Sequence, residues 1–242
     1  GGAKSVVRFS IIYNMKKGEA LIIGDQTGVG KGRQMAALIR WAHRQGKKPI
    51  FMTKYDYLAD DIYRDLKDIG CGDFKPFIFN DYKISEIIKD KEGKERKKTI
   101  FKPATPKQIA EALQNGKIPD DYDYVLCTYS QISTGDDISR EYENNLSKEE
   151  DGGSRRRTSR TPKPGAKPRK QTKAVLLRKL AKGNYLMLDE SHTAAGESNQ
   201  GFYMQTLVRD SKAVTFASAT YAKRPDTMPL YALRTAMSKA NI

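Results

Sequence analysis

The sequence predicts an α/β fold in which a mostly parallel sheet is covered by helices on both faces. Short, continuous apolar runs alternate along the chain with longer segments whose apolar residues recur at helical spacing, a pattern typical of parallel strands linked by helices. A glycine-rich loop joins the first apolar run to a helix. With 242 residues, 38% of them hydrophobic, the chain can bury one large core. We expect one domain over residues 1–242, with a basic flexible insertion at residues 135–172.

The strands are predicted from apolar runs bounded by polar or glycine residues. Because these runs show no alternation, they are typical of strands that are buried on both faces. They lie at residues 20–23, 49–53, 75–79, 123–128, 184–188 and 213–217. The lysine-rich residues 81–102 interrupt this pattern and are expected to form an exposed hairpin or loop.

The helices are predicted from apolar residues at helical spacing together with capping residues. One start is well defined, with Thr105 as the cap, Pro106 in the first position and Gln108 three residues after the cap, and Gly116 ends that helix. The first helix after the glycine-rich loop has an apolar face formed by Met35, Leu38, Ile39 and Ala42. The predicted helices cover residues 6–16, 31–45, 55–69, 106–115, 174–182 and 201–209, and a last one includes Leu230, Leu233 and Met237.

The composition indicates a polyanionic partner. The chain has 44 Lys and Arg residues against 29 Asp and Glu, a net charge of +15, so nucleic acid is the first candidate. No apolar run approaches the ~20 residues that cross a bilayer, so we expect no membrane partner and an intracellular location. Cys71 and Cys127 are expected to be buried free thiols. With two histidines in all, a structural zinc site is disfavoured.

The glycine-rich loop has the composition of a phosphate-binding loop. Its residues are Gly24, Asp25, Gln26, Thr27, Gly28, Val29, Gly30, Lys31, Gly32 and Arg33. Glycines let backbone N–H groups curl around phosphate oxygens, the helix N-terminus adds its positive dipole, and Lys31 can place an ammonium against the β and γ phosphates. The structural alternative is a glycine-rich turn with an exposed lysine.

This loop departs from the common pattern GxxxxGK[ST] at two positions. Asp25 replaces the first small residue, and Gly32 replaces the Ser or Thr whose hydroxyl binds Mg²⁺. A dinucleotide-binding oxidoreductase is a poor alternative, because Arg33 stands where that motif needs its third glycine.

Two acids follow the apolar run at residues 184–188. Asp189 and Glu190 would project from a strand end toward a bound nucleotide, where one carboxylate can hold Mg²⁺ and the next can orient or deprotonate a water. We assign Asp189 to the metal, through water, and Glu190 to the attacking water. The alternative is that both acids cap the following helix.

The order of these motifs resembles that of superfamily 2 helicases of the DExH type. Residues 28–31, 189–192 and 218–220 resemble motifs I, II and III, residues 124–131 resemble motif Ib, and residues 52–54 stand in the place of motif Ia. The nearest likeness is to the strawberry notch branch, whose phosphate loop has a similar Gly-Asp-x-x-Gly-Val-Gly-Lys-Gly-Arg form, and residues 64–70 also look like a stretch of that family. Residues 216–225 favour a resemblance to the phage or plasmid members of this branch.

The resemblance implies a RecA-like P-loop NTPase fold with ATP and Mg²⁺ as cofactors. His192, Ser218 and Thr220 would couple the nucleotide state to a nucleic-acid surface; a structural histidine and a simple strand end are the alternatives. Thr53, Lys54, Thr128 and Tyr129 would contact the nucleic acid. A second RecA-like domain would supply arginine side chains that complete the ATP site, so we expect this chain to be a fragment that is nearly inactive alone.

The basic insertion offers a further nucleic-acid contact. Arg155, Arg156, Arg157 and Lys170 could follow a DNA or RNA backbone without sequence preference, and a solvated linker is the alternative. We expect the first RecA-like domain of a DNA helicase or translocase, cytoplasmic if bacterial or phage-encoded and nuclear if from an animal relative. The alternative is a catalytically silent scaffold or nucleic-acid-binding module within a large phage, plasmid or coregulator protein.

Overall fold

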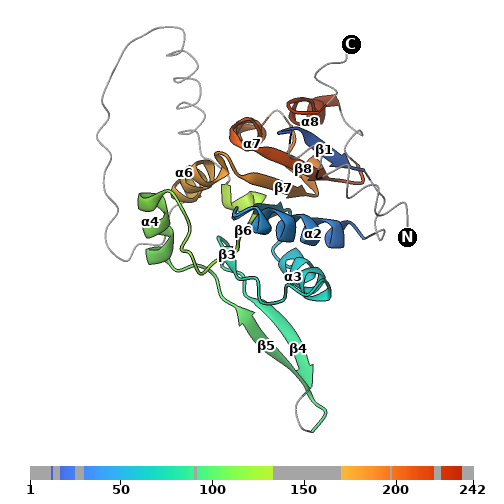
Figure 1. Ribbon diagram of the computed structural model, residues 1–242, viewed down its shortest axis with the longest axis vertical. Coiled ribbons are helices and arrows are strands. Elements are labelled where there is room, and N and C mark those ends of the chain that lie inside the picture. The colour runs from blue at the N-terminus through green and yellow to red at the C-terminus, as the bar shows by residue number, and fades with distance from the viewer. Residues whose placement is uncertain are drawn as a thin grey trace.

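A six-stranded parallel sheet lies at the centre of the protein (Figure 1). The computed structural model describes residues 12, 17–24, 30–89, 92–132, 170–196, 198–220 and 225–235. The strands of the sheet are β1 (Ala20–Ile23), β2 (Ile50–Thr53), β3 (Pro76–Ile78), β6 (Tyr124–Thr128), β7 (Tyr185–Asp189) and β8 (Ala213–Ala217). They pair in the order β1-β8-β7-β2-β6-β3, and every neighbouring pair is parallel. All six carboxyl ends therefore lie at one edge of the sheet, where ligands bind in open α/β folds.

Helices cover both faces of the sheet, as predicted. One face packs against α2 (Lys31–Arg44) and α3 (Leu58–Asp68), and the other against α4 (Pro106–Asn115), α6 (Lys170–Ala181), α7 (Asn199–Asp210) and α8 (Met228–Ala232). Strand side chains alternate between the two layers: in β2, Phe51 packs with α2 and α3, whereas Ile50 and Met52 belong to the opposite core. Within the described residues, every helix is too short or too polar to span a bilayer. The predicted fold class is confirmed.

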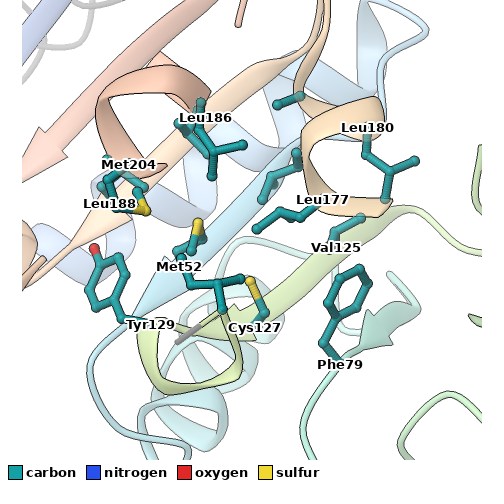
Figure 2. Close-up of a cluster of buried hydrophobic side chains, with 14 of the residues drawn as sticks. Met52, Phe79, Val125, Cys127, Tyr129, Leu177, Leu180, Leu186, Leu188 and Met204 are labelled. Atoms are coloured by element: carbon teal, nitrogen blue, oxygen red, sulfur yellow. The ribbon is translucent and has the colours of Figure 1, made fainter. Parts of the chain in front are cut away.

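The core beneath α6 and α7 shows how apolar strands and helices meet. Figure 2 shows strand residues Met52, Val125, Cys127, Leu186 and Leu188 packed with helix residues Leu177, Leu180 and Met204. Each such side chain that is removed from water stabilises the fold by about 1.5–3 kcal/mol. Cys127 here and Cys71 in the opposite core are buried free thiols, which confirms that prediction.

The ends of the helices follow from local sequence. In α4, the Thr105 hydroxyl accepts the N–H of Gln108 at 3.3 Å, and the Gln108 side-chain oxygen accepts the N–H of Thr105 at 2.9 Å. Gly116 ends the helix in a left-handed conformation with φ 68°, where glycine is favoured. The capping box predicted from the sequence is therefore confirmed.

The lysine-rich segment forms an antiparallel hairpin of β4 (Ile84–Lys89) and β5 (Glu95–Phe101) that extends away from the sheet beside α3 (Figure 1). A two-stranded hairpin is marginally stable alone, and its base is tied to α3. Asp60 accepts hydrogen bonds from Tyr82 Oη at 2.5 Å and from the N–H of Ser85 at 3.2 Å. Of the hairpin and loop expected from the sequence, the hairpin is observed.

Some predicted boundaries differ from the structure. Helix α6 begins at Lys170, within the predicted insertion, and not at residue 174. Residues 170–172 are polar, so the apolar periodicity did not reveal this first turn. In the structure, the buried Lys173 ammonium donates to the Phe79 carbonyl and to Gln131 Oε1. Helix α3 begins at Leu58 and not at residue 55, because a turn closed by Leu58 N–H to the Tyr55 carbonyl precedes it.

Several predictions lie outside the described residues. These are the insertion from residue 135 to residue 169, Met237, and the helix at residues 6–16 except Ile12, which is helical and packs against the core beneath α2. Leu230, predicted to be in the last helix, is buried in α8. Short 3₁₀ helices complete the described chain: η1 (Tyr129–Ile132), η2 (Ser191–Thr193) and η3 (Pro225–Thr227).

Candidate nucleotide site

Three neighbouring strands bring the start of the glycine-rich loop and the acid pair to one edge of the sheet. Gly24 directly follows β1, Asp189 is the last residue of β7, and Ser218 follows β8, which lies between β1 and β7. The middle of the loop, which comprises Asp25, Gln26, Thr27, Gly28 and Val29, lies outside the described residues. The edge therefore unites residues that are more than 160 positions apart in the sequence.

The N-terminus of α2 is suited to bind an anion. Gly30 precedes the helix with φ 85°, a left-handed conformation that is strained for other residues, and Lys31 is the first helical residue. A Cβ at position 30 would meet no atom within 4 Å, so the conformation and not crowding favours glycine here. The first turn contains no acidic residue. The positive end of the helix dipole is therefore available to phosphate oxygens.

Lys31 and the acid pair act on one another electrostatically. Burial, followed by the neighbouring Glu190 carboxylate, raises the pKa of Asp189 to about 6, while Lys31 and the Thr53 hydroxyl act to lower it. The ammonium of Lys31 is therefore near enough to stabilise the charged form of Asp189. A buried carboxylate that is costly to ionise without a partner is a favourable place for a cation.

Glu190 is held in an uncommon backbone conformation. Its φ of 49° and ψ of 39° are left-handed, and no other non-glycine residue in the described ranges has a positive φ. Thr193 fixes the turn, because its N–H and its hydroxyl both donate to the Glu190 carbonyl, at 3.0 and 2.9 Å. The Glu190 side chain makes no capping hydrogen bond to the turn that follows, so helix capping does not explain it. Such strain costs about 1–3 kcal/mol and is found mainly at functional sites.

His192 connects the acid pair to β8. Its Nδ1 lies 2.9 Å from Ser218 Oγ and 3.4 Å from Glu190 Oε2. Ser218 Oγ also accepts the N–H of Thr220 at 3.1 Å, and the N–H of Ser218 donates to the Ile23 carbonyl at the end of β1. The structure therefore brings together His192, Ser218 and Thr220, which the sequence assigned to coupling.

The two residues that follow Lys31 contact α3. A Cβ at position 32 would lie 2.0 Å from Asp65 Oδ2, so glycine leaves room for that carboxylate. Arg33 Nη2 pairs with Asp68 Oδ2 at 2.7 Å, and Arg33 Nε lies 3.9 Å from Asp65 Oδ1. The Arg33 side chain therefore ties α2 to α3, and the nucleotide contact predicted for Arg33 remains a prediction. Burial raises the pKa of Asp65, whereas Arg64 and Arg33 lower it.

One of the residues predicted to contact nucleic acid belongs instead to the surroundings of the acid pair. Thr53 is fully buried, and its hydroxyl lies 3.5 Å from Asp189 Oδ2 as a donor. A buried side chain at the end of β2 cannot contact a nucleic acid on the surface. The sequence correctly predicted that Thr53 lies at a strand end. It could not predict that β7 lies beside β2, because the order of the strands in the sheet is seen only in the structure.

Lys54, Thr128 and Tyr129 line an open groove of about 540 Å³ beside the acid pair. Of the three, Lys54 is exposed, whereas Thr128 and Tyr129 are buried like Thr53. The other residues that line it are Tyr55, Asp56, Asn80, Asp81, Ser130, Gln131, Thr193 and Gln200. Tyr129 Oη donates to the Asp189 carbonyl at 2.8 Å, so the wall of the groove is bonded to the strand end that carries the acids. Of the other predicted contacts, Lys170 is the first residue of α6, and Arg155, Arg156 and Arg157 lie outside the described residues.

The side chains present at the site fit a nucleotide-bound Mg²⁺. Within the described residues, no group of three or more His, Cys, Asp or Glu side chains could hold a metal ion by itself. Mg²⁺ in nucleotide sites takes most of its ligands from phosphates and water, and needs one or two carboxylates from the protein. Asp189 is such a carboxylate, partly buried and with a raised pKa.

Comparison with known protein families also indicates a P-loop NTP hydrolase. The model of the family described as "P-loop containing NTP hydrolase pore-1" matches residues 6–144, more than half of the chain. The chain belongs to this family. The matched range includes the whole glycine-rich loop, α2 and α3.

The chain is also similar to strawberry notch proteins, as the motifs predicted. The strawberry notch homolog of Caenorhabditis elegans is 29% identical over 189 residues, which are 77% of this chain and 9% of that protein. Strawberry notch of Drosophila melanogaster is 35% identical over 81 residues, which are 33% of this chain and 5% of that protein. The chain thus spans less than a tenth of the length of these relatives.

A solved structure identifies the fold. The SWI2/SNF2 ATPase core of Sulfolobus solfataricus, in complex with dsDNA, matches with a TM-score of 0.56 and 11% identity, over 96% of this chain and 35% of that chain. The protein therefore has the RecA-like fold of this ATPase core, as the motifs predicted. Its phage or plasmid origin remains a prediction.

Proposed function

We propose that this chain is the ATP-hydrolysing first RecA-like domain of a superfamily 2 helicase or translocase that acts on DNA. One observation carries the proposal. Lys31 at the start of α2 and the acids Asp189 and Glu190 at the end of β7 lie at one edge of the sheet, with Lys31 stabilising the charge of Asp189.

Each residue at this edge of the sheet has a separate role in phosphoryl transfer to water. Bound ATP·Mg²⁺ supplies the γ-phosphoryl group and a Lewis acid. The N-terminus of α2 and the Lys31 ammonium would neutralise phosphate charge, and Asp189 would hold the metal. Glu190 orients the attacking water and accepts its proton as the bond to the β-phosphate oxygen breaks, which releases ADP and phosphate.

His192 and Ser218 are proposed to report the state of the nucleotide. One imidazole nitrogen, Nδ1, faces both the Glu190 carboxylate and Ser218 Oγ, so a shift of Glu190 on hydrolysis would alter the contact between His192 and Ser218. Thr220 depends on the same hydroxyl through its N–H. The contacts among His192, Ser218 and Thr220 therefore connect the acid pair to the residues that follow β8.

A second RecA-like domain is proposed to complete the site with arginine side chains that stabilise the transferring phosphate. The chain covers 35% of the Sulfolobus ATPase core that it matches, which leaves room for such a domain in a longer protein. Without it, we expect nucleotide binding with little turnover.

DNA, with RNA as the alternative, is the proposed polyanionic partner. The net charge of +15 and the complex of the Sulfolobus core with dsDNA support it. The groove beside the acid pair contains one cation, Lys54, and two carboxylates, Asp56 and Asp81, so base edges fit it better than phosphates. Tyr55, which lines the groove, stacks with Tyr57, and their ring centroids are 5.3 Å apart. Phosphate contacts are assigned to the predicted residues Arg155, Arg156, Arg157 and Lys170.

The test is ATP turnover, with and without DNA, in a protein that contains both RecA-like domains. Lys31→Ala and Glu190→Gln are each expected to reduce DNA-stimulated turnover by at least about a hundredfold. Matched controls are Arg44→Ala, which removes an exposed cation at the other end of α2, and Glu111→Gln, which neutralises an exposed carboxylate on α4. Turnover that is indifferent to Lys31→Ala and Glu190→Gln would reject hydrolysis at this site and favour the silent scaffold.

A further inference from the structure

An oxygen atom occupies the space of the side chain that Gly32 lacks. In the common phosphate-loop pattern, this position carries a Ser or Thr whose hydroxyl binds Mg²⁺. Here Asp65 Oδ2 lies 2.0 Å from the place where a Cβ of residue 32 would stand, and the Asp65 carboxyl carbon lies 3.1 Å from it. An oxygen ligand is therefore present beside Gly32, but it comes from α3.

The Asp65 carboxylate is incompletely neutralised by the protein. Its side chain is 15% exposed, and its ion pair among the described residues is with Arg33 at 3.9 Å, while the charge of Arg64 also favours its ionised form. Arg33 makes a much closer pair with Asp68, at 2.7 Å. Buried carboxylates are costly unless they are paired or bind a metal ion. Asp65 thus has a charge that a cation at the end of the phosphate loop would balance.

Building on the ATP·Mg²⁺ hydrolysis proposed above, we infer that Asp65 replaces the missing loop hydroxyl as a ligand of the nucleotide-bound Mg²⁺. Carboxylate oxygens are the preferred protein ligands of this hard cation. In this protein, Gly32 and Asp65 form a complementary pair, since glycine makes the space that the carboxylate fills. The Arg33–Asp68 ion pair, which also joins α3 to α2, does not include the Asp65 carboxylate oxygen that occupies the space beside Gly32.

The competing role for Asp65 is purely structural, as part of the contact between α2 and α3. Asp68 provides the matched control, because it lies on the same helix and makes the closer ion pair with Arg33. A structural role predicts similar effects of Asp65→Asn and Asp68→Asn. A metal-binding role predicts that only Asp65→Asn alters the dependence of nucleotide binding on Mg²⁺.

The experiment measures the affinity of the 242-residue chain for a fluorescent ATP analogue, with Mg²⁺ and with EDTA. For the wild type, Mg²⁺ is expected to tighten binding. Asp65→Asn is expected to reduce this Mg²⁺ effect by at least about tenfold, with little change in EDTA, while Asp68→Asn keeps the wild-type ratio. The swap Gly32→Ser/Asp65→Ala restores much of the effect, because the hydroxyl returns to position 32 and the carboxylate no longer blocks it.

Mn²⁺ titration followed by electron paramagnetic resonance gives a second readout, in which Asp65→Asn weakens Mn²⁺ binding in the presence of the nucleotide. A wild-type Mg²⁺ ratio in Asp65→Asn would overturn the inference, and so would equal losses in Asp65→Asn and Asp68→Asn. A swap variant that folds but binds no better than Asp65→Asn would also overturn it. If the wild type binds no nucleotide at all, the proposed function itself fails, which is a different outcome.

Discussion

Replacing Asp189 with Asn is expected to stabilise the nucleotide-free protein while removing its ability to hold Mg²⁺. Burial, then the Glu190 carboxylate, raises the pKa of Asp189 from 3.8 to about 6, so the folded protein binds this proton more tightly than the unfolded chain does. Above about pH 6 the carboxyl is ionised in both states, and the folded state bears the full cost of the buried charge. The cost fades as the pH falls from about 6 toward 3.8, because the folded state becomes protonated first.

The magnitude follows from the size of the shift. A difference of about two pKa units corresponds to about 3 kcal/mol of unfolding free energy near pH 8. Because Asp189 is not fully buried, and an Asn oxygen can still accept from Thr53, we expect Asp189→Asn to gain about 2 kcal/mol, which is a rise of about 4–8 °C in melting temperature. Near pH 5 the gain should fall to about half of that value.

The assay is urea denaturation of the wild type and Asp189→Asn between about pH 8 and pH 5, without nucleotide or Mg²⁺. Asp73→Asn is the matched control, since Asp73 is exposed and its replacement should change stability little at either pH. A loss of stability in Asp189→Asn near pH 8 would refute the reasoning. A gain that is the same at both ends of the pH range would refute it as well, because it would not arise from the charge.

Three further predictions concern the loop, the groove and the insertion. Gly30→Ala should cost about 1–2 kcal/mol because of its left-handed φ of 85°, and should weaken ATP binding. Gly46→Ala, at the other end of α2 with φ 69°, should cost a similar amount in thermal melts yet leave ATP affinity unchanged, and equal ATP affinity in both variants would contradict the role of Gly30. Tyr57 is 55% exposed and stacked on Tyr55, so Tyr57→Ala should weaken binding of a single-stranded oligonucleotide by about 5–100-fold in fluorescence anisotropy, while Tyr57→Phe should not; a Tyr57→Ala variant that binds as tightly as Tyr57→Phe would exclude base stacking there. Deletion of residues 154–170 should weaken DNA binding and flatten its salt dependence, and an unchanged salt titration would reject a contact role for the insertion.

Much of the fold could be predicted from the sequence because its signals are local. The uninterrupted apolar runs marked the six strands of the sheet, and the capping box at Thr105 marked the start of α4. The placement of Asp189 and Lys31 at one edge also followed, since parallel strands direct all their carboxyl ends the same way. These inferences needed only periodicity, capping chemistry and strand direction.

The remaining features depend on packing between elements, which periodicity does not encode. Thr53 resembled a surface contact at a strand end, but β7 pairs with β2 and buries it against Asp189. Gly32 departs from the common phosphate-loop pattern, and the sequence alone could not show that Asp65 of α3 occupies the space of the missing side chain. The side chain of Arg33 pairs with Asp68, 35 residues away, which the loop motif alone could not indicate. Lys170 was assigned to the insertion because the residues around it are polar, although α6 begins at this residue.

The most direct test of the central claim is a double-mutant cycle on ATP·Mg²⁺ affinity, with Lys31→Ala, Asp189→Asn and the double variant measured by isothermal titration. If Lys31 and Asp189 act on one bound metal-nucleotide, the two losses should be non-additive by about 1 kcal/mol or more. Losses that add within about 0.5 kcal/mol, or an Asp189→Asn variant with wild-type affinity for ATP·Mg²⁺, would contradict the claim that the phosphate loop and the acid pair serve a single triphosphate.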